Sequence, residues 1–224
     1  MNNTASQVKI CGLQHLDLLK EVCKLPVDFI GFMLAESRRR VELDSLKAMI
    51  SYIRSIGPSA PLATGVFVNP DAEELEQILS EAPLDVIQLH GQESPEFCRF
   101  IKRKFNLPII KVFSIKQMED KESLLDAVMS YRDCMDILLL DTHDPVYGGG
   151  SGRTFNWGII PEVKRWAQNE QIPLMIAGGL HPGNVEQLIK RYGPDGVDVS
   201  SGVETDGQKD LDKIITFVER VKQL

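Results

Sequence analysis

The chain has 224 residues, of which 43% are hydrophobic and 25% charged, with a formal net charge of −7 at pH 7. This length suits one compact domain whose core needs no disulfides. The acidic balance argues against a general nucleic-acid-binding protein, which carries a basic excess. The four cysteines form no C-x-x-C pair, so zinc-ribbon and redox motifs are not expected. Without a signal-peptide pattern or a membrane-length apolar run, we expect a cytoplasmic protein with no nucleic-acid or membrane partner.

Short apolar, β-branched runs recur along the whole chain, at intervals of about 28 residues, close to the length of one β/α unit. Near-continuous hydrophobicity is typical of strands that are buried on both faces of a parallel sheet. We therefore expect eight strands, at residues 8–11, 29–34, 64–68, 86–90, 109–113, 137–141, 174–179 and 196–201.

Amphipathic stretches separate these runs, and several begin with helix-start signals. Ser94-Pro95-Glu96, for example, places Pro in the first turn of a helix. Eight strands alternating with eight helices predict an α/β protein, a (β/α)8 or TIM barrel that forms a single domain over residues 1–224. A doubly wound open sheet is the structural rival. It needs no eighth unit and usually has a glycine-rich turn after the first strand, where only Gly12 stands.

The active site of such a barrel lies at the carboxyl ends of the strands. Cys11 ends the first predicted strand, His90 the fourth and Asp141 the sixth. Glycines and serines follow the last two strands, where this fold recurrently forms a phosphate site from backbone amides and hydroxyls. The expected phosphate-binding residues are Gly178, Gly179, Asp198, Ser200, Ser201 and Gly202. The sequence thus predicts a small-molecule substrate that carries a phosphate group.

Motifs along the chain resemble the phosphoribosylanthranilate isomerase family of tryptophan biosynthesis. They fall in order at residues 8–12, 65–69, 86–91, 139–142, 149–155, 177–180 and 197–204 and span essentially the whole chain. The resemblance implies a ribulose-phosphate-binding type of barrel. It also implies an Amadori rearrangement of N-(5-phosphoribosyl)anthranilate, in which an acid opens the ribose ring and a base removes the proton on C2. Such a reaction needs no cofactor and no metal.

The resemblance assigns the general base to Cys11 and the general acid to Asp141. A thiol needs nearby positive charge to act as a base, and Lys9 lies on the same side of its strand. An acid must hold its proton at neutral pH, and the apolar run 137–140 before Asp141 favours the protonated form of a carboxyl. From the residues alone, an inert buried cysteine and a surface carboxylate remain open. Cys23, Cys98 and Cys134 are better interpreted as packing residues.

Arg39 matches the family's arginine for the anthranilate carboxylate, because a guanidinium fork fits a planar carboxylate. Because three arginines are consecutive, the match does not decide between Arg39 and its neighbours, and Arg38 and Arg40 are alternatives for the carboxylate. A third alternative is that the run is only a solvated basic surface. Glycines at 148–150 and 152 resemble a lid that closes over substrate. His90, two residues from Gln88, either contacts substrate or is a structural histidine.

Four other functions are weighed against this one. An indole-glycerol-phosphate synthase would be a sibling phosphate-binding barrel. A Schiff-base aldolase would need a lysine in the barrel mouth, whereas Lys9 and Lys111 lie centrally in their strands; a metal epimerase would need several histidine and acidic ligands, whereas the chain has four histidines. A non-catalytic sugar-phosphate-binding barrel would be expected to lack Cys11 or Asp141. Both a monomer and a homodimer are compatible with the sequence.

Overall fold

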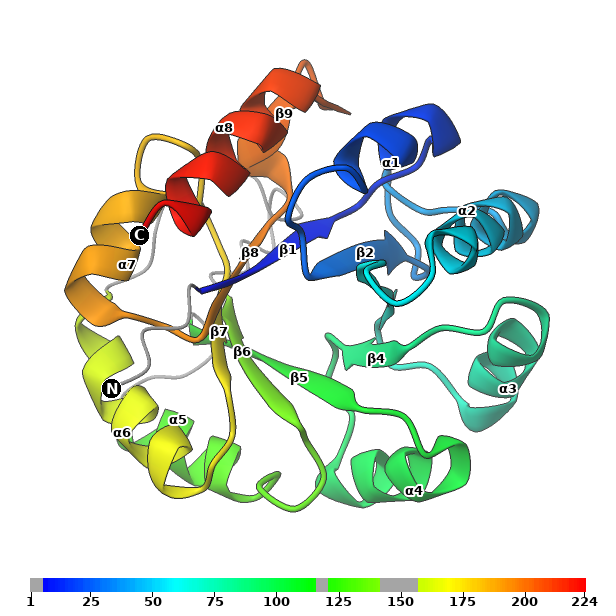
Figure 1. Ribbon diagram of the computed structural model, residues 1–224. Coiled ribbons are helices and arrows are strands. Elements are labelled where there is room, and N and C mark those ends of the chain that lie inside the picture. The colour runs from blue at the N-terminus through cyan, green and yellow to red at the C-terminus, as the bar shows by residue number, and fades with distance from the viewer. Residues whose placement is uncertain (1–5, 116–120, 142–156) are drawn as a thin grey trace.

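Eight parallel strands close into a barrel in the computed structural model, which describes residues 6–115, 121–141 and 157–224. Each strand pairs with its neighbour in the chain, and β1 pairs with β8 to complete the ring, as Figure 1 shows. The predicted (β/α)8 barrel is confirmed. The strands are β1 (Gln7–Cys11), β2 (Phe29–Met33), β3 (Leu62–Phe67), β4 (Val86–Leu89), β5 (Ile109–Ser114), β6 (Ile137–Asp141), β7 (Leu174–Ile176) and β8 (Gly196–Val199).

Helices surround the barrel, and α8 lies beside α1, so the last element meets the first (Figure 1). Ser94 and Asp71 cap α4 and α3 by accepting hydrogen bonds from the amides of Phe97 and Glu74. The helices are α1 (Leu16–Val22), α2 (Leu43–Ile56), α3 (Ala72–Glu81), α4 (Pro95–Phe105), α5 (Lys121–Met129), α6 (Ile160–Asn169), α7 (Val185–Tyr192) and α8 (Leu211–Lys222).

Alternation along each strand divides the buried residues into two layers. Val8 and Ile10 of β1 join the large core between barrel and helices. Inside the barrel, a smaller apolar cluster is formed by Phe29, Val86, Ile110, Val112, Ile137, Leu139, Met175 and Ala177. Because side chains two apart share a face, Cys11, His90 and Asp141 continue the inward-facing series at the ends of β1, β4 and β6.

After β8 the chain forms three short elements that the sequence did not predict. A single-turn helix η3 (Ser201–Val203) leads into a small hairpin of β9 (Glu204–Thr205) and β10 (Gln208–Lys209), which precedes α8. Asp206 and Gly207 at its tip have φ of 51° and 78°, the left-handed conformations that tight turns use. This hairpin brings two charged side chains back to the barrel.

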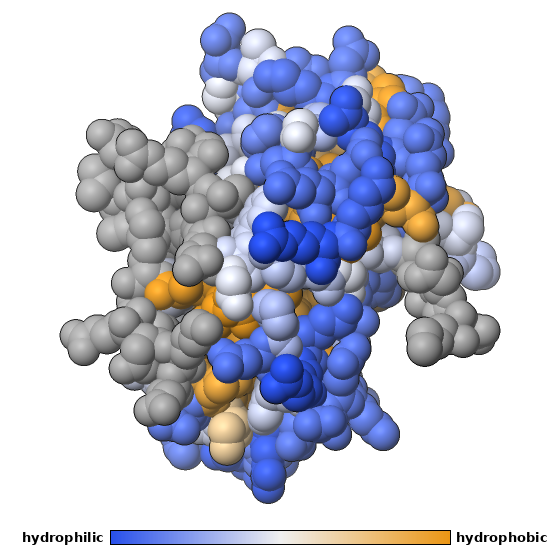
Figure 2. Space-filling model, turned by 90° about the vertical axis from the view of Figure 1, so that its left-hand side faces the viewer, coloured by the Kyte–Doolittle hydropathy of each residue, from blue (hydrophilic) through white to orange (hydrophobic). Residues whose placement is uncertain are grey.

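The surface is mostly polar. On the face shown in Figure 2, hydrophilic side chains cover most of the visible described surface. Over the described residues, the exposed large hydrophobic side chains are Leu62, Val68, Phe100, Met129 and Leu224. No helix in these described ranges is long and apolar enough to cross a membrane.

Candidate active site

Cys11 sits at the end of β1, faces the barrel interior and is 5% exposed. Lys9, two residues earlier, lies on the same face, and its ammonium charge acts on the Cys11 thiol. Gly31 on the neighbouring strand makes room for both side chains. A Cβ at Gly31 would lie 2.7 Å from Cys11 Sγ and 2.9 Å from Lys9 Nζ, closer than real contacts allow. The expectation that Lys9 and Cys11 share a side of the strand is confirmed.

Asp198 on β8 completes this interior cluster. Its Oδ1 lies 3.0 Å from Lys9 Nζ, which is fully buried. Burial lowers the pKa of Lys9, but the Asp198 carboxylate and Cys11 outweigh burial, so the pKa is raised and Lys9 stays protonated. For Cys11, burial raises the pKa above the ordinary thiol value, with Lys9 and Lys209 opposing the rise. Without a ligand, the candidate base therefore rests as the protonated thiol.

Asp141 ends β6, and its side chain is 19% exposed at the same carboxyl end of the barrel. Its Oδ2 lies 3.4 Å from Nε2 of His90. The other ring nitrogen of His90, Nδ1, lies 3.3 Å from Nε2 of Gln88. An amide nitrogen can only donate, so this contact puts the proton of a neutral His90 on Nε2, which faces Asp141.

Arg39 is the buried member of the arginine run at 6% exposure, whereas Arg38 and Arg40 are exposed. Its Nε and Nη2 donate to the two oxygens of Glu204, at 2.7 and 3.1 Å. Gln14, in the loop after β1, donates to the backbone oxygens of Arg38 and Arg40 and so holds the arginine segment at the mouth. Among the described residues, the second terminal nitrogen of Arg39 has no acceptor, which leaves one edge of the guanidinium for a ligand.

The loops after β7 and β8 fit closely against each other. Gly178 and Gly179 have φ of 83° and 65°, which only glycine adopts without strain. A Cβ at Gly202 would lie 1.7 Å from the backbone oxygen of Leu180, so the second loop can approach the first only because this residue has no side chain. Ser200 and Ser201 stand between these glycines at the start of η3. The two predicted phosphate loops thus form one continuous surface.

Known proteins match this chain over nearly its full length. A family model described as N-(5'phosphoribosyl)anthranilate (PRA) isomerase matches residues 8–220. A curated N-(5'-phosphoribosyl)anthranilate isomerase from Brevibacillus brevis is 44% identical over 217 residues, 97% of this chain and 94% of its relative. This chain belongs to the phosphoribosylanthranilate isomerase family. Its members are aldose–ketose isomerases of tryptophan biosynthesis, and the chain shares that activity.

Solved structures of phosphoribosylanthranilate isomerases agree with this assignment. The Thermotoga maritima isomerase superposes with a TM-score of 0.82 at 32% identity, over 98% of this chain and all of that chain. A second isomerase structure, at 29% identity and a TM-score of 0.78, contains reduced 1-(o-carboxyphenylamino)-1-deoxyribulose 5-phosphate and covers the same shares. The synthase, epimerase, aldolase and non-catalytic alternatives are therefore set aside.

The structure changes the role expected of Asp198. The sequence placed it among the phosphate-binding residues of the isomerase, but its carboxylate faces the barrel interior and pairs with Lys9. A carboxylate repels a phosphate, and this one lies beside Lys9 and Cys11, so its side chain does not suit the predicted phosphate site. The predicted lid at residues 148–152 lies outside the described residues.

Two buried charged residues at the mouth were missed by sequence reasoning. Glu204 holds Arg39, and Lys209 contacts both Glu204 and Ser200, at 2.7 and 2.9 Å. Both stand on the hairpin after β8. Burial raises the pKa of Glu204, but the hydrogen bonds from Arg39 and Lys209 outweigh it and hold this pKa at about 2. In the sequence, each residue is one more charge in a polar stretch, and no hydrophobic period indicates that the segment folds back.

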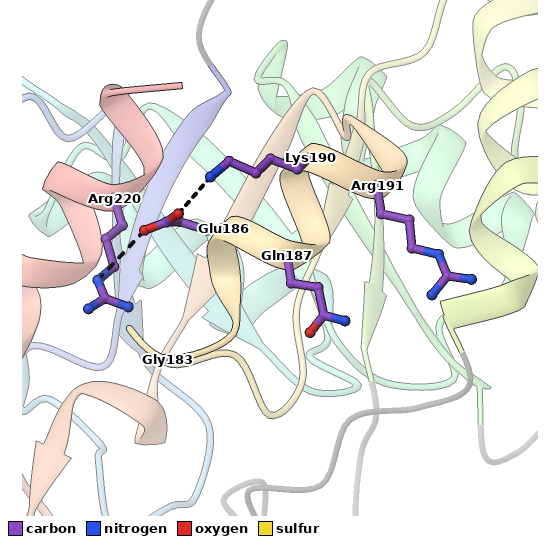
Figure 3. Close-up of a pocket in the computed structure, with 6 residues that line it drawn as sticks. All are labelled: Gly183, Glu186, Gln187, Lys190, Arg191 and Arg220. Atoms are coloured by element: carbon purple, nitrogen blue, oxygen red, sulfur yellow. Dashed lines mark hydrogen bonds and ion pairs between the residues drawn. The ribbon is translucent and has the colours of Figure 1, made fainter.

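A surface hollow of about 550 Å³ lies apart from these residues, on α7 and α8 (Figure 3). Glu186 points toward Lys190 and Arg220 across it, at 2.8 and 4.0 Å. These three side chains are 41–61% exposed, so their pairing is screened by water and contributes little. None of the predicted site residues lines this hollow.

Proposed function

We propose that Asp141 and Cys11 are the general acid and the general base of the Amadori rearrangement of N-(5-phosphoribosyl)anthranilate. One observation supports this assignment above the others. Both side chains face the interior at the same end of the barrel, on strands that β7 and β8 separate around the ring. A substrate held between them presents its ribose ring to an acid on one side and a base on the other, which is the arrangement that acid–base catalysis requires.

Asp141 delivers its proton to the ring oxygen, the bond from that oxygen to C1 breaks, and a Schiff base forms between C1 and the anthranilate nitrogen. His90 faces Oδ2 of Asp141, so the transferred proton resides on Oδ1. Their 3.4 Å contact is longer than an ordinary hydrogen bond, and such contacts often tighten when substrate binds. We assign His90 to orienting Asp141, with Gln88 fixing its tautomer.

Cys11 then removes the proton from C2, which gives an enolamine. Its tautomerisation, in which C1 gains a proton and the hydroxyl on C2 loses one, gives the ketone of 1-(2-carboxyphenylamino)-1-deoxyribulose 5-phosphate. Lys9 stabilises the thiolate by its positive charge. Because burial raises the pKa of the free enzyme's thiol, we expect kcat/KM to increase with pH beyond the ordinary thiol range, near 8.5. The acid and the base can also titrate as a coupled pair, so that each limb of the pH–rate profile reports on both groups.

Two anion sites hold the substrate ends. The free edge of Arg39 binds the anthranilate carboxylate, and Gly178, Gly179, Ser200, Ser201 and Gly202 bind the phosphate. The related isomerase that contains the reduced product supports a ligand with this pair of anionic groups. All of these residues come from one chain, so a monomer suffices for the site, and a homodimer would use two independent sites. We place the enzyme in the cytoplasm, where a biosynthetic enzyme with reduced thiols is expected.

The test is to supply N-(5-phosphoribosyl)anthranilate and follow the loss of anthranilate fluorescence. We expect the wild-type protein to consume it, and Asp141→Asn to reduce turnover about 10²–10⁴-fold, because an amide cannot donate the carboxyl proton. His90→Asn should reduce turnover less and leave KM near that of the wild type. A wild-type protein without activity would refute the function. Full activity in Asp141→Asn would refute the acid assignment and make His90 the next candidate.

A further inference from the structure

Lys209 is a buried cation that the reaction so far does not use. It extends from β10 toward the barrel mouth, and its side chain is 6% exposed. Its Nζ donates to Oε1 of Glu204 at 2.7 Å, to the backbone oxygen of Ser200 at 2.9 Å and to Oγ of Ser200 at 3.2 Å. A buried ammonium is costly unless it is paired, and these acceptors pair all three of its hydrogens.

Lys209 and Arg39 share one carboxylate. Oε1 of Glu204 accepts hydrogen bonds from Nζ of Lys209 and Nε of Arg39, both at 2.7 Å. Its Oε2 accepts one from Nη2 of Arg39 at 3.1 Å. Glu204 is therefore fixed from two sides by cations on different loops. Its position sets the plane of the guanidinium, and with it the edge that faces a ligand.

The same ammonium stands next to the candidate base. A Cβ built on Gly12, the residue after Cys11, would lie 2.9 Å from Cδ of Arg39, 3.4 Å from Oγ of Ser200 and 3.5 Å from Nζ of Lys209. Gly12 has φ of 82°, and it lets these side chains close over the end of β1. The charged groups that act on Cys11 are Lys9 from β1, Asp198 from β8 and Lys209 from β10.

We propose that Lys209 is a positioning residue of the isomerase that couples its two ends: it holds Glu204, which orients Arg39 for the substrate carboxylate, and it supplies positive charge beside Cys11. This proposal rests on the function proposed above. Around Cys11 the cations Lys9, Lys209 and Arg39 outnumber the carboxylates of Asp198 and Glu204 by one, so the cluster carries a net positive charge. Without Lys209, the remaining two cations and two carboxylates would balance.

The alternative is that Lys209 only fastens the hairpin. Lys213 offers a matched control, because its Nζ donates to the backbone oxygen of the same Glu204 at 2.7 Å without touching the carboxylate. Lys213→Met removes a lysine tether from this hairpin and leaves the charges around Cys11 and Arg39 unchanged. Lys209→Gln keeps a hydrogen-bond donor without the charge, and Lys209→Arg keeps the charge.

The experiment measures the rate of Cys11 alkylation by iodoacetamide as a function of pH, with the modified peptide identified by mass spectrometry. We expect Lys209→Met and Lys209→Gln to move the alkylation midpoint to higher pH, and Lys209→Arg to restore it. In the fluorescence assay, both neutral variants should raise KM about tenfold or more, as expected for a weakened charge-assisted contact to the substrate carboxylate. Lys213→Met should change neither the midpoint nor KM.

An unchanged midpoint and KM in folded Lys209→Gln would overturn the proposal, as would equal shifts in Lys213→Met. Circular dichroism establishes which variants are folded, and Lys209→Gln substitutes for the methionine variant if that one unfolds. Alkylation does not depend on turnover. A wild-type protein without isomerase activity would therefore refute the proposed function, whereas an active wild type with an unaffected Lys209→Gln variant would refute the role of Lys209 alone.

Discussion

The barrel contains two buried lysine–carboxylate pairs with almost the same geometry and different surroundings. Lys9 and Asp198 lie 3.0 Å apart inside the barrel, and Lys111 and Glu93 lie 2.9 Å apart outside it, between β5 and the helices. All four side chains are at most 10% exposed. One pair lies beside the thiol of Cys11, and the other lies among groups that carry no proposed chemistry.

Both members of the outer pair make several further hydrogen bonds. Lys111 also donates to the backbone oxygens of Leu89 and Gly91, and Glu93 accepts from the amides of Asn69 and Gly91. The inner Lys9 has Asp198 and Cys11 as its partners. A lysine with many hydrogen-bond acceptors holds loops in place, whereas a cation beside a thiol lowers that thiol's pKa. The two ion pairs have similar geometry, so it is the groups around each pair that distinguish a structural role from a catalytic one.

The largest effect should come from the thiol itself. Cys11→Ala should lower turnover about 10²–10⁴-fold, the usual loss for a general base, with binding of the reduced product retained. Turnover is measured by anthranilate fluorescence and binding by calorimetry. Cys98→Ala, a buried thiol of the outer layer, is the control and should keep wild-type turnover per folded molecule. Near-normal turnover in Cys11→Ala would remove this residue from the mechanism.

Breaking each lysine pair should separate stability from activity. Lys111→Met leaves Glu93 buried without its cation and should destabilise the fold by about 3–5 kcal/mol, while turnover per folded molecule persists. Lys9→Met should lower both stability and turnover, because it also removes the cation that contacts Cys11. Urea unfolding and turnover at matched folded fractions measure the two effects. Equal losses of turnover in both variants would show that the two pairs do not differ in function.

Arg39→Ala sharpens the distinction between the two ends of the substrate. It should weaken binding of the reduced product about ten- to hundredfold, the cost of one charge-assisted pair. Inorganic phosphate, which lacks the anthranilate group, should bind as in the wild type. Arg40→Ala changes an exposed neighbour and serves as the control. Parallel losses for phosphate and product would place Arg39 at the phosphate or in a purely structural role.

The smallest expected effect is on the pH dependence of folding stability, through the side chain of Glu204. Its pKa of about 2 in the folded chain lies below the value near 4.3 of an unfolded glutamate. Glu204 therefore adds stability above about pH 4.3, and this contribution is lost as the pH falls toward 2. Glu204→Gln should be less stable than the wild type at pH 7, with a difference that shrinks between about pH 5 and 2. Urea midpoints measure it, with exposed Glu219→Gln as control; a pH-independent difference would contradict the linkage.

Much of the fold follows from hydrophobic patterning. A run such as 137–140 is apolar at every position because both of its faces are buried, and this continuous pattern predicts a parallel strand without knowledge of its partners. Counting eight such runs predicts the barrel, and the barrel predicts that Cys11 and Asp141 meet at one end. Arg39 was also expected, and its burial now distinguishes it from Arg38 and Arg40.

The remaining site residues depend on contacts between distant segments. Asp198 follows the phosphate-site pattern in sequence, but the register of β8 beside β1 places it opposite Lys9. Lys209 reaches the mouth only because the chain reverses at residues 206–207. The pair Asp206-Gly207 is a local signal for a tight turn, but it does not indicate which residues the reversed segment contacts. The register of β8 beside β1 has no such local signal.

The pair that joins β1 to β8 also bears on how the chain is made. Lys9 and Asp198 are 189 positions apart, so at about 5–20 residues per second a ribosome adds Asp198 roughly 10–40 s after Lys9. During that interval the first strand has no acidic partner and no barrel around it. The surroundings of Cys11 are therefore assembled late, because Asp198 arrives with β8 and Lys209 only with β10, once the ring can close.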